Sequence, residues 1–246
     1  MANVVLLTGC NTVFGLVIAK KFLDNDWSVV GIDKEPECVE KLEKMYYVQG
    51  DICKKNDRER ILNMAVEKYG KIAALINATD AQPKITTDLL QITEENFDSA
   101  IENTLKGTFF FSQLVAKRMM KQRKNYEICG RIINVSSMYA YFTSTDYGAH
   151  CISQASISSM TKVFAHRLAV EGIIVNEIRP GMMEAALSDE EEKKYKKYKE
   201  DGFIPLDRWG TSWYVADMAF FLCNDNLTYI VGQAIDVDGG IHLRRL

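Results

Sequence analysis

Short runs of apolar residues alternate with helical patterns along the whole of this chain, and this alternation is its most constraining feature. The runs are almost continuously apolar, as in "VVLL" at residues 4–7 and "IIVNEI" at 173–178. A strand that is apolar on both faces is typical of a parallel sheet covered by helices on each side. Right-handed crossovers between such strands produce a doubly wound sheet, so the sequence predicts an α/β fold.

Seven strands and six helices are expected from the pattern. The strands are predicted at residues 4–7, 27–32, 45–49, 72–77, 131–136, 173–178 and 234–238. The helices are predicted at about 15–25, 35–44, 55–69, 94–122, 147–171 and 212–224. Because no repeat, linker or low-complexity tract divides the chain, residues 1–246 are expected to form a single Rossmann-like domain around one seven-stranded parallel sheet.

The composition is that of an ordinary globular protein, and it argues against several function classes. Of the 246 residues, 26% are charged, and the formal net charge is −3. Without a basic excess, neither nucleic acid nor an anionic membrane is an expected partner. No apolar run approaches the ~20 residues that span a bilayer. The segment "NVVLLTG" at 3–9 also lacks the cleavage site of a signal peptide.

The cysteines are scattered and give no support for a metal site, because none belongs to a C-x-x-C pair. Small buried thiols, kept reduced in a cytoplasmic protein, are the simpler interpretation. The six are Cys10, Cys38, Cys53, Cys129, Cys151 and Cys223.

Polar signals for a dinucleotide follow three of the predicted strands. "TGCNTVFG" at 8–15 has the glycines of a tight turn that opens a helix beside a pyrophosphate. Asp33 ends the second strand, where a carboxylate can hold both hydroxyls of an adenosine ribose and repel a 2′-phosphate. Asp51 ends the third strand, where it could meet adenine or simply cap the following helix. Asp33 favours NAD over NADP, with Lys34 beside it as a counterargument.

With these motifs in order, the chain resembles a short-chain dehydrogenase/reductase over nearly its whole length. The family's TGxxxGxG turn is matched by Thr8, Gly9 and Gly15. The segment "NATD" at 77–80 corresponds to the family's Asn-Asn-Ala-Gly motif. Further matches are Asn103 in a helix, Ser137 after the fifth strand, Pro180-Gly181 after the sixth, and the C-terminal patterns "PLDRWG" and "YIVGQAIDVDGG".

The resemblance implies a Rossmann-like domain that binds NAD(P) and carries out carbonyl or alcohol redox chemistry. It also implies a homodimer or homotetramer that assembles through the helices at 94–122 and 147–171. The implied catalytic residues are Asn103, Ser137, His150 and Gln154. The implied cofactor-binding residues are Gly9, Asn11, Phe14, Gly15, Asp33, Asp51, Ile52, Asn77, Gln154, Pro180 and Gly181.

The pattern breaks at the family's YxxxK motif, where this chain has His150 and Gln154. In the family the tyrosine donates a proton to the carbonyl oxygen, and the lysine binds the nicotinamide ribose and lowers the tyrosine pKa. Glutamine can hydrogen-bond a ribose hydroxyl but carries no charge. Tyr147 lies three residues upstream of His150 and is not interpreted as a displaced catalytic tyrosine.

Three further departures surround the same ligand. Val13 replaces the middle glycine of the turn, which is costly if that position needs a positive φ. Asp80 replaces a glycine and adds negative charge, and Ala185 replaces a threonine that often binds the carboxamide. Weakened or lost NAD binding is therefore one open outcome.

Three hypotheses follow for the function. The first is a remodelled NAD(H)-dependent oxidoreductase in which His150 is the general acid and Ser137 holds the carbonyl oxygen. The second is a catalytically silent nucleotide-binding, scaffold or partner subunit on the same fold. The third, a Ser137–His150 nucleophilic pair, lacks an evident third group or oxyanion hole. Neutral structural roles also remain open, with His150 packing at a helix start and Gln154 exposed on the helix surface.

Two segments bear on the substrate, which the sequence does not identify. A lid-like charged segment spans about 186–204, and within it "SDEEEKKYKKYKED" at 188–201 predicts a solvated helix with i,i+4 pairs Glu190–Lys194 and Glu192–Lys196. This composition favours an open cleft or a protein contact. By contrast, "MYAYF" at 138–142 suits an apolar or aromatic ligand, or core packing.

Overall fold

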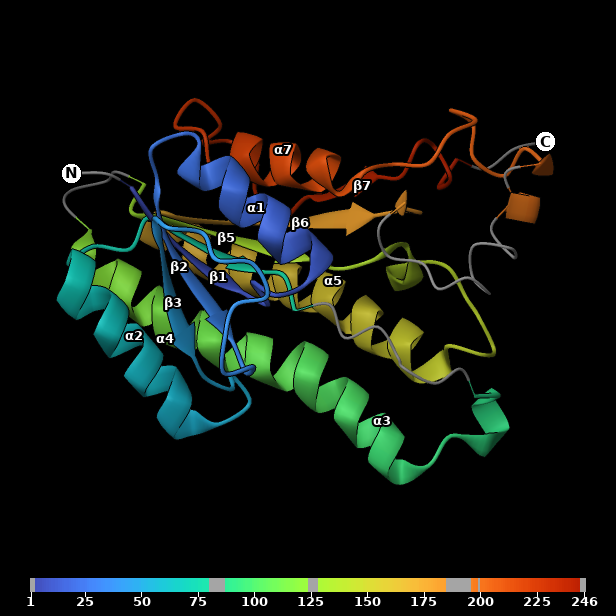
Figure 1. The fold of residues 1–246 in the computed structure, drawn as a ribbon, viewed down its shortest axis with the longest axis horizontal. Helices are drawn as coiled ribbons and strands as arrows, with labels where there is room; N and C mark the ends of the chain where they lie inside the picture. The colour runs from blue at the N-terminus through green and yellow to red at the C-terminus, as the bar shows by residue number, and fades with distance from the viewer. Residues whose placement is uncertain (1–2, 80–86, 124–127, 185–195, 199, 244–246) are drawn as a thin grey trace.

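The computed structural model describes residues 3–79, 87–123, 128–184, 196–198 and 200–243 (Figure 1). One seven-stranded parallel sheet runs through it in the order β3-β2-β1-β4-β5-β6-β7, which confirms the predicted doubly wound fold. The strands are β1 (Val4–Thr8), β2 (Ser28–Asp33), β3 (Met45–Gln49), β4 (Ala74–Asn77), β5 (Gly130–Val135), β6 (Ile173–Pro180) and β7 (Ala234–Val237).

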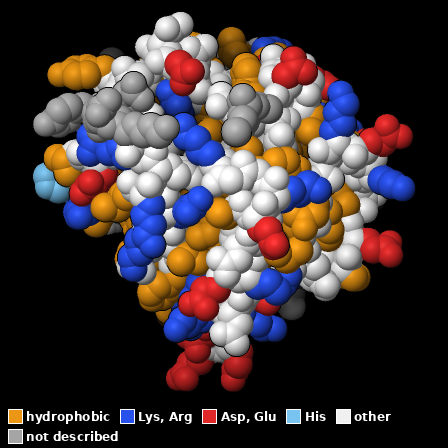
Figure 2. Space-filling model, turned by 90° about the vertical axis from the view of Figure 1, so that its left-hand side faces the viewer, with side chains coloured by type: hydrophobic (Ala, Val, Ile, Leu, Met, Phe, Trp, Pro, Cys, Tyr) orange, Lys and Arg blue, Asp and Glu red, His pale blue; other side chains and the backbone are white. Residues whose placement is uncertain are grey.

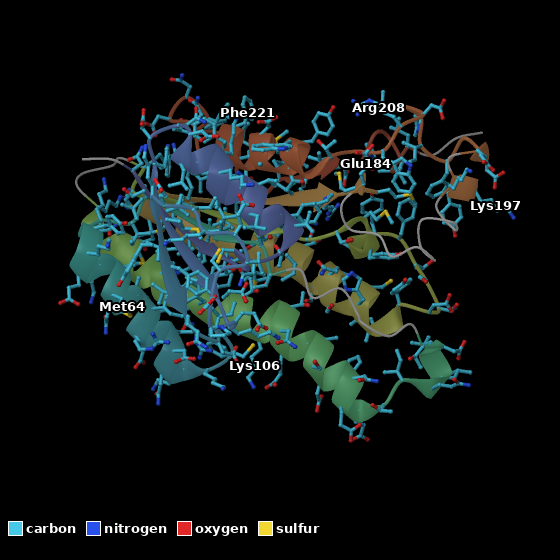
Figure 3. All side chains as sticks on the ribbon, in the orientation of Figure 1. Met64, Lys106, Glu184, Lys197, Arg208 and Phe221 are labelled. Carbon is cyan, nitrogen blue, oxygen red and sulfur yellow. The ribbon has the colours of Figure 1, made fainter. Side chains whose placement is uncertain are left out.

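Helices cover both faces of the sheet (Figure 1). On one face, α1 (Val13–Leu23) packs beside α7 (Ser212–Leu222), and their apolar side chains form one core with that side of the strands. On the other face, a second core is built by α2 (Lys55–Tyr69), α4 (Gly107–Gln122) and α5 (Gly148–Leu168). Side chains fill the space between the sheet and each helical layer (Figure 3).

The register of the parallel strands brings their carboxyl ends to one edge of the sheet. Thr8 at the end of β1 pairs with Ile32 of β2 and with Asn77 of β4. Asp33 at the end of β2 pairs with Gln49 at the end of β3. The polar residues that follow these strands are therefore gathered at the edge where α/β folds bind ligands.

The helix predicted at 35–44 is wrong, because residues 34–44, here called the β2–β3 segment, form bends and turns. In a helix, the Val39 N–H would bond to the Glu35 carbonyl. Instead the Val39 N–H donates to the Asn11 side chain at 3.0 Å, and the Glu35 carbonyl accepts from the Tyr47 hydroxyl at 2.5 Å. The Asn11 amide also donates to the Glu37 carbonyl at 2.9 Å. Tertiary hydrogen bonds thus consume the groups that a helix would need.

The single helix predicted at 94–122 is divided in the structure. It consists of α3 (Glu94–Ile101), a π-helical turn η2 (Glu102–Lys106) and α4. A π turn widens a helix by one residue and occurs frequently at functional sites. The helix predicted at 147–171 corresponds to α5 followed by the short 3-10 turn η4 (Ala169–Glu171).

Several predictions fall outside the described residues, among them Asp80, Ala185 and both Glu–Lys pairs of the charged segment. Within the described part of that segment, Tyr198 is half-buried and stacks against Phe203 with ring centroids 5.3 Å apart. No described helix is long and apolar enough to cross a membrane. On the face shown in Figure 2, Lys and Arg side chains are interspersed with Asp and Glu.

Replacement of Asn11 by alanine is expected to release the β2–β3 segment, because three hydrogen bonds to Glu37, Val39 and Tyr47 are lost. Amide hydrogen exchange followed by mass spectrometry should show faster exchange in residues 34–44 in Asn11→Ala. The control is Asn25→Ala, whose side chain bonds only locally to the Lys21 carbonyl. Unchanged protection of residues 34–44 in Asn11→Ala would contradict this role.

Candidate active site

A cleft of about 720 Å³ opens at the carboxyl ends of β1, β2 and β3 and reaches the first turn of α5. Seven of the residues predicted for the site line it: Gly9, Asn11, Asp33, Asp51, Ile52, Asn103 and His150. The structure therefore brings the predicted adenosine side and the predicted catalytic helix into one cavity. Other lining residues were not among the predicted site residues, and they include Thr8, Thr12, Cys53, Ser99, Asp146 and Tyr147.

The turn between β1 and α1 requires glycine at two positions. Gly9 has a φ of +68°, and a Cβ there would lie 2.4 Å from the Ala78 carbonyl oxygen. A Cβ on Gly15 would lie 2.0 Å from the Gly9 carbonyl oxygen. The Thr12 hydroxyl caps α1, because it accepts from the Gly15 N–H at 3.0 Å and donates to the Gly9 carbonyl at 2.8 Å. This packing holds the N-terminus of α1 at the cleft.

Val13 does not strain this turn. It is the first residue of α1, and the non-glycine residues with positive φ in the described chain are Asp26 and Asp207. The backbone cost considered for Val13 therefore does not arise. Its side chain is 37% exposed and is not part of the cleft lining.

Asp33 is half-buried, and its carboxylate is oriented by backbone donors. One oxygen accepts from the Asn11 N–H at 3.1 Å and the other from the Glu35 N–H at 3.3 Å. A carboxylate oxygen has more than one acceptor site, so Asp33 can still receive ribose hydroxyls. Asn11 lines the cleft, but its side-chain amide is used by the β2–β3 segment.

Asp51 has a structural role as well as a place in the cleft. Its carboxylate accepts from the Cys53 N–H at 2.9 Å, which forms the turn that leads into α2. Lys54, the N-cap of α2, makes no side-chain capping bond. Asp51 therefore stabilises the turn before α2, and the helix-capping alternative raised for it is wrong, because Lys54 occupies the N-cap position. Burial, followed by the Asp51 charge, raises the pKa of the Cys53 thiol to about 11.

Asn103 lies in the π turn between α3 and α4 and lines the cleft. Its side-chain amide donates to the Ser99 carbonyl at 2.8 Å, and its oxygen lies 3.9 Å from the Cys53 thiol. These contacts fix the amide at the edge of the cavity, between the end of β3 and the helix.

Tyr139 contacts both Ser137 and His150. Ser137 caps the short turn η3 (Met138–Ala140), and its hydroxyl accepts from the Tyr139 N–H at 3.3 Å. The His150 ring, from the first turn of α5, meets the Tyr139 ring edge-on at 5.3 Å. His150 is 4% exposed and borders the cleft, whereas Ser137 is not among the lining residues. Tyr147 also borders the cleft and stacks on Tyr139.

Gln154 is 2% exposed, so the alternative of an exposed surface glutamine is wrong. Its Oε1 has no hydrogen-bond partner among the described residues. A buried amide oxygen without a donor is costly, and native structures normally supply one. The position therefore fits a ligand hydroxyl or an ordered water that donates to Oε1.

The remaining predicted cofactor residues do not line the cleft. Phe14 is buried in the core beside α7. The Asn77 amide is buried and donates to Ser112 and to Asn134, at 3.0 and 2.8 Å. Gly181 follows Pro180 at the end of β6, and a Cβ there would lie 2.6 Å from the Asp238 Cβ. Close packing alone accounts for glycine at this position.

A buried charged network, missed by the sequence analysis, joins β5 and β6 to α5. Glu177 on β6 is 1% exposed and accepts from the Ser136 hydroxyl at 2.5 Å and the Ser158 hydroxyl at 2.7 Å. The Arg179 guanidinium donates to Glu177 at 3.0 Å and to Ser158 at 2.8 Å. Because Ser136 precedes Ser137 and Ser158 lies one turn beyond Gln154, this Glu177 network fixes the serine relative to the helix.

The aromatic segment 138–142 contributes mainly to packing. Met138, Tyr139, Tyr141 and Phe142 belong to an apolar cluster with Met182, Ile204 and Ile241. The Tyr141 hydroxyl donates to Asp238 at 3.0 Å. The core-packing alternative therefore accounts for this segment. No group of three potential metal ligands occurs among the described residues.

Comparison with known proteins identifies the family. A family model described as enoyl-(acyl carrier protein) reductase matches residues 11–242. The 3-oxoacyl-[acyl-carrier-protein] reductase FabG of Thermotoga maritima is 32% identical over 251 residues and is covered, like this chain, to 97%. The same reductase of Rickettsia conorii is 32% identical over 243 residues, covering 96% of this chain and 95% of the relative.

Solved structures agree with the sequence relatives. The 3-oxoacyl-[acyl-carrier protein] reductase of Brucella melitensis in complex with NAD gives a TM-score of 0.91 at 26% identity, covering 100% of this chain and 99% of that one. A short chain dehydrogenase of Bacillus anthracis gives a TM-score of 0.88 at 29% identity, covering 99% and 98%. The chain therefore belongs to the short-chain dehydrogenase/reductases, a family of oxidoreductases.

Removal of the Glu177 carboxylate should destabilise the fold strongly. Glu177→Ala leaves the Arg179 charge, 16% exposed, without its main partner, and breaking a buried pair typically costs about 3–5 kcal/mol. Glu59→Ala is the control, because the Lys55–Glu59 pair is exposed and such pairs contribute about 0–1 kcal/mol. Urea unfolding measures both variants. Equal effects of the two substitutions would show that the Glu177 network contributes no more than a surface pair.

Proposed function

We propose that the protein is an NAD(H)-dependent oxidoreductase of a carbonyl or alcohol substrate, in which His150 and Gln154 stand where the family resemblance implies tyrosine and lysine. The observation that carries the proposal is the single cleft that extends from Asp33 at the end of β2 to His150 on α5. A cavity of this extent, with a carboxylate at one end and an imidazole at the other, suits an extended dinucleotide.

Specificity for NAD over NADP rests on Asp33. Its carboxylate would hold the ribose hydroxyls and oppose the charge of a 2′-phosphate. Lys34 lines the same cleft and works in the opposite direction, so the preference is expected to be moderate. The Brucella melitensis relatives are described in complexes with NAD and with NADH, which supports the same choice.

His150 and Asn103, which line the cleft, and Ser137 and Gln154, which lie behind its lining, divide the remaining tasks. When bound, the nicotinamide ring supplies or accepts the hydride. His150 donates a proton to the carbonyl oxygen in the reducing direction and accepts one in the oxidising direction. Ser137 holds the same oxygen by a hydrogen bond, and the Gln154 Oε1 accepts from a ribose hydroxyl, which satisfies its buried oxygen. Asn103 orders water at the entrance.

The names of the relatives support a proposed substrate class. Those from Thermotoga maritima and Rickettsia conorii are named 3-oxoacyl-[acyl-carrier-protein] reductases. A 3-oxoacyl thioester is therefore the first carbonyl compound to test on this protein.

We also propose that the protein forms a homodimer or homotetramer. Its proposed location is the cytoplasm, a reducing compartment. Phe110 on α4 is 41% exposed, and Ile152 and Val163 on α5 are 51% and 61% exposed. Exposed apolar side chains on these two helices support a subunit contact there. The six cysteines are all free thiols, which supports a reducing environment.

Calorimetric titration with NADH and, separately, with NADPH tests the cofactor. Wild-type protein should bind NADH with a micromolar Kd, about −8 kcal/mol. Asp33→Asn should weaken NADH binding about tenfold, or ~1.4 kcal/mol, and reduce the preference over NADPH. Asp26→Asn is the control, since Asp26 is exposed and asparagine tolerates its positive φ of 61°. Absence of NADH binding by wild-type protein at millimolar cofactor would refute the proposed function.

Replacement of the proton donor tests the chemistry. His150→Phe keeps an aromatic ring against Tyr139 but removes the proton, so NADH oxidation with a 3-oxoacyl thioester should fall to the level of the uncatalysed reaction. Tyr147→Phe is the matched control, because Tyr147 borders the same cleft.

The pattern of loss decides between three assignments. Loss in Tyr147→Phe but not in His150→Phe would make Tyr147 the acid. NADH binding without turnover in wild-type protein, across a panel of carbonyl compounds, would instead identify a catalytically silent nucleotide-binding subunit.

A further inference from the structure

The segments that carry Cys10 and Cys38 lie side by side, next to the Asp33 end of the cleft. Cys10 follows Gly9 in the turn after β1 and is fully buried. Its Sγ lies against β2, where a Cβ placed on Gly31 would come within 3.1 Å of it. Cys38 is half-buried in the β2–β3 segment. These residues are 28 positions apart in sequence, and the fold brings their segments together.

The backbone around Cys38 is fixed relative to Cys10 by the residue next to Cys10. The Asn11 side chain bonds to the Glu37 carbonyl at 2.9 Å and to the Val39 N–H at 3.0 Å, on either side of Cys38. The Cys10 N–H donates to the Ile32 carbonyl at 3.3 Å, which fixes the Cys10 backbone against β2. Two neighbouring residues of the turn are thus anchored to β2 and to the β2–β3 segment.

The pKa shifts of the neighbouring groups are consistent with this placement. Burial, then the Asp33 carboxylate, then Cys38 raise the pKa of the Cys10 thiol, and a side-chain interaction with Cys38 adds to this. For Tyr47, burial again comes first, and both Cys10 and Cys38 are among the groups that raise its pKa. These shared contributions agree with the arrangement of the backbone, in which Asn11 holds the Cys38 segment next to Cys10.

We propose that Cys10 and Cys38 are a modification site at which a hydroperoxide forms a reversible intramolecular disulfide that controls dinucleotide binding. Both residues lie outside the roles assigned to the cleft, and the bond they form would link the phosphate-side turn directly to the β2–β3 segment.

The chemistry balances in two steps with hydrogen peroxide as the oxidant. The partly exposed Cys38 attacks the peroxide as the thiolate, which breaks the O–O bond and yields a sulfenic acid and hydroxide. The Cys10 sulfur then attacks the Cys38 sulfur, the S–O bond breaks, and the Cys10 proton leaves with the departing hydroxide as water. Overall, two thiols lose two electrons and peroxide is reduced to two molecules of water. Cys38 reacts first because burial beside Asp33 keeps Cys10 protonated.

The disulfide should alter the cleft. A disulfide requires an S–S distance of about 2.05 Å and Cβ atoms about 3.8 Å apart, so the β2–β3 segment must move toward the turn. Asp33, Lys34 and Glu35 line the cleft and lead directly into that segment. Their displacement weakens the contact with the adenosine ribose. This consequence rests on the proposed function, whereas formation of the bond does not.

Tryptic mapping gives a direct test of the bond. Cleavage after Lys20, Lys34 and Lys41 places Cys10 in peptide 1–20 and Cys38 in peptide 35–41, and each peptide has a single cysteine. After treatment of the full-length protein with hydrogen peroxide and alkylation, mass spectrometry without reduction should find these two peptides linked. Dithiothreitol should restore both as free peptides.

Cysteine variants test which thiols form the bond, and the affinity for NADH tests its effect on binding. Cys38→Ser should abolish the linked species, whereas Cys151→Ser, at another partly buried thiol, should retain it. The disulfide form should bind NADH at least tenfold more weakly than the reduced form, with recovery on reduction. Cys38→Ser should bind NADH equally before and after peroxide.

The results distinguish the modification site, its effect on NADH binding and the proposed function. Absence of the linked peptides after peroxide, or their persistence in Cys38→Ser, overturns the modification site. Linked peptides with unchanged NADH affinity overturn the control of binding. If the reduced protein does not bind NADH at all, the proposed function fails, and the peptide map alone decides whether the disulfide forms.

Discussion

The contact between the turn after β1 and the end of β4 is the constraint on which the site depends. Gly9 approaches the Ala78 carbonyl so closely that no Cβ fits, and the Thr12 hydroxyl lies 3.2 Å from the same oxygen. This contact stands where the strand order reverses, because β1 lies between β2 and β4. It fixes the start of α1, and through Asn11 it also fixes Asp33 and the β2–β3 segment. A single turn thus determines where a dinucleotide would meet the protein.

The two ends of the cleft are held by different kinds of interaction. At the Asp33 end, backbone N–H groups orient the carboxylate, and an amide side chain orders a segment without regular structure. Near the His150 end, buried side chains with charge join β5, β6 and α5 around Glu177. A loop held by backbone hydrogen bonds can change its conformation when a local bond such as a disulfide forms. A buried charged network resists rearrangement, because each broken contact leaves an unpaired charge. A change in the redox state of the thiols would therefore act on cofactor affinity more than on the catalytic group.

Periodicity predicted the elements that depend on burial, and it failed where side chains compete with the backbone. The strand at 45–49 and the helix at 55–69 occur with the predicted bounds. The helix at 35–44 was wrong because Asn11 and Tyr47, distant in sequence, take its backbone groups. The π turn around Asn103 and the burial of Gln154 also depend on neighbours brought in by the fold. Motif matching placed seven site residues in the cleft, but close packing alone accounts for the glycine at Gly181.

The pairing of His150 with Gln154 has a physical logic within the proposed function. A lysine one turn beyond a catalytic tyrosine assists it, since a positive charge favours loss of the phenolic proton. The same charge would also lower the pKa of a histidine, but there it would deplete the protonated imidazole that must donate. A neutral residue therefore suits a histidine acid, and glutamine keeps the hydrogen-bonding capacity without the charge. Burial adds to the argument, because a lysine with 2% exposure would need a carboxylate partner, and Glu177 is already paired with Arg179. The two residues are better understood as one coupled replacement than as two separate losses.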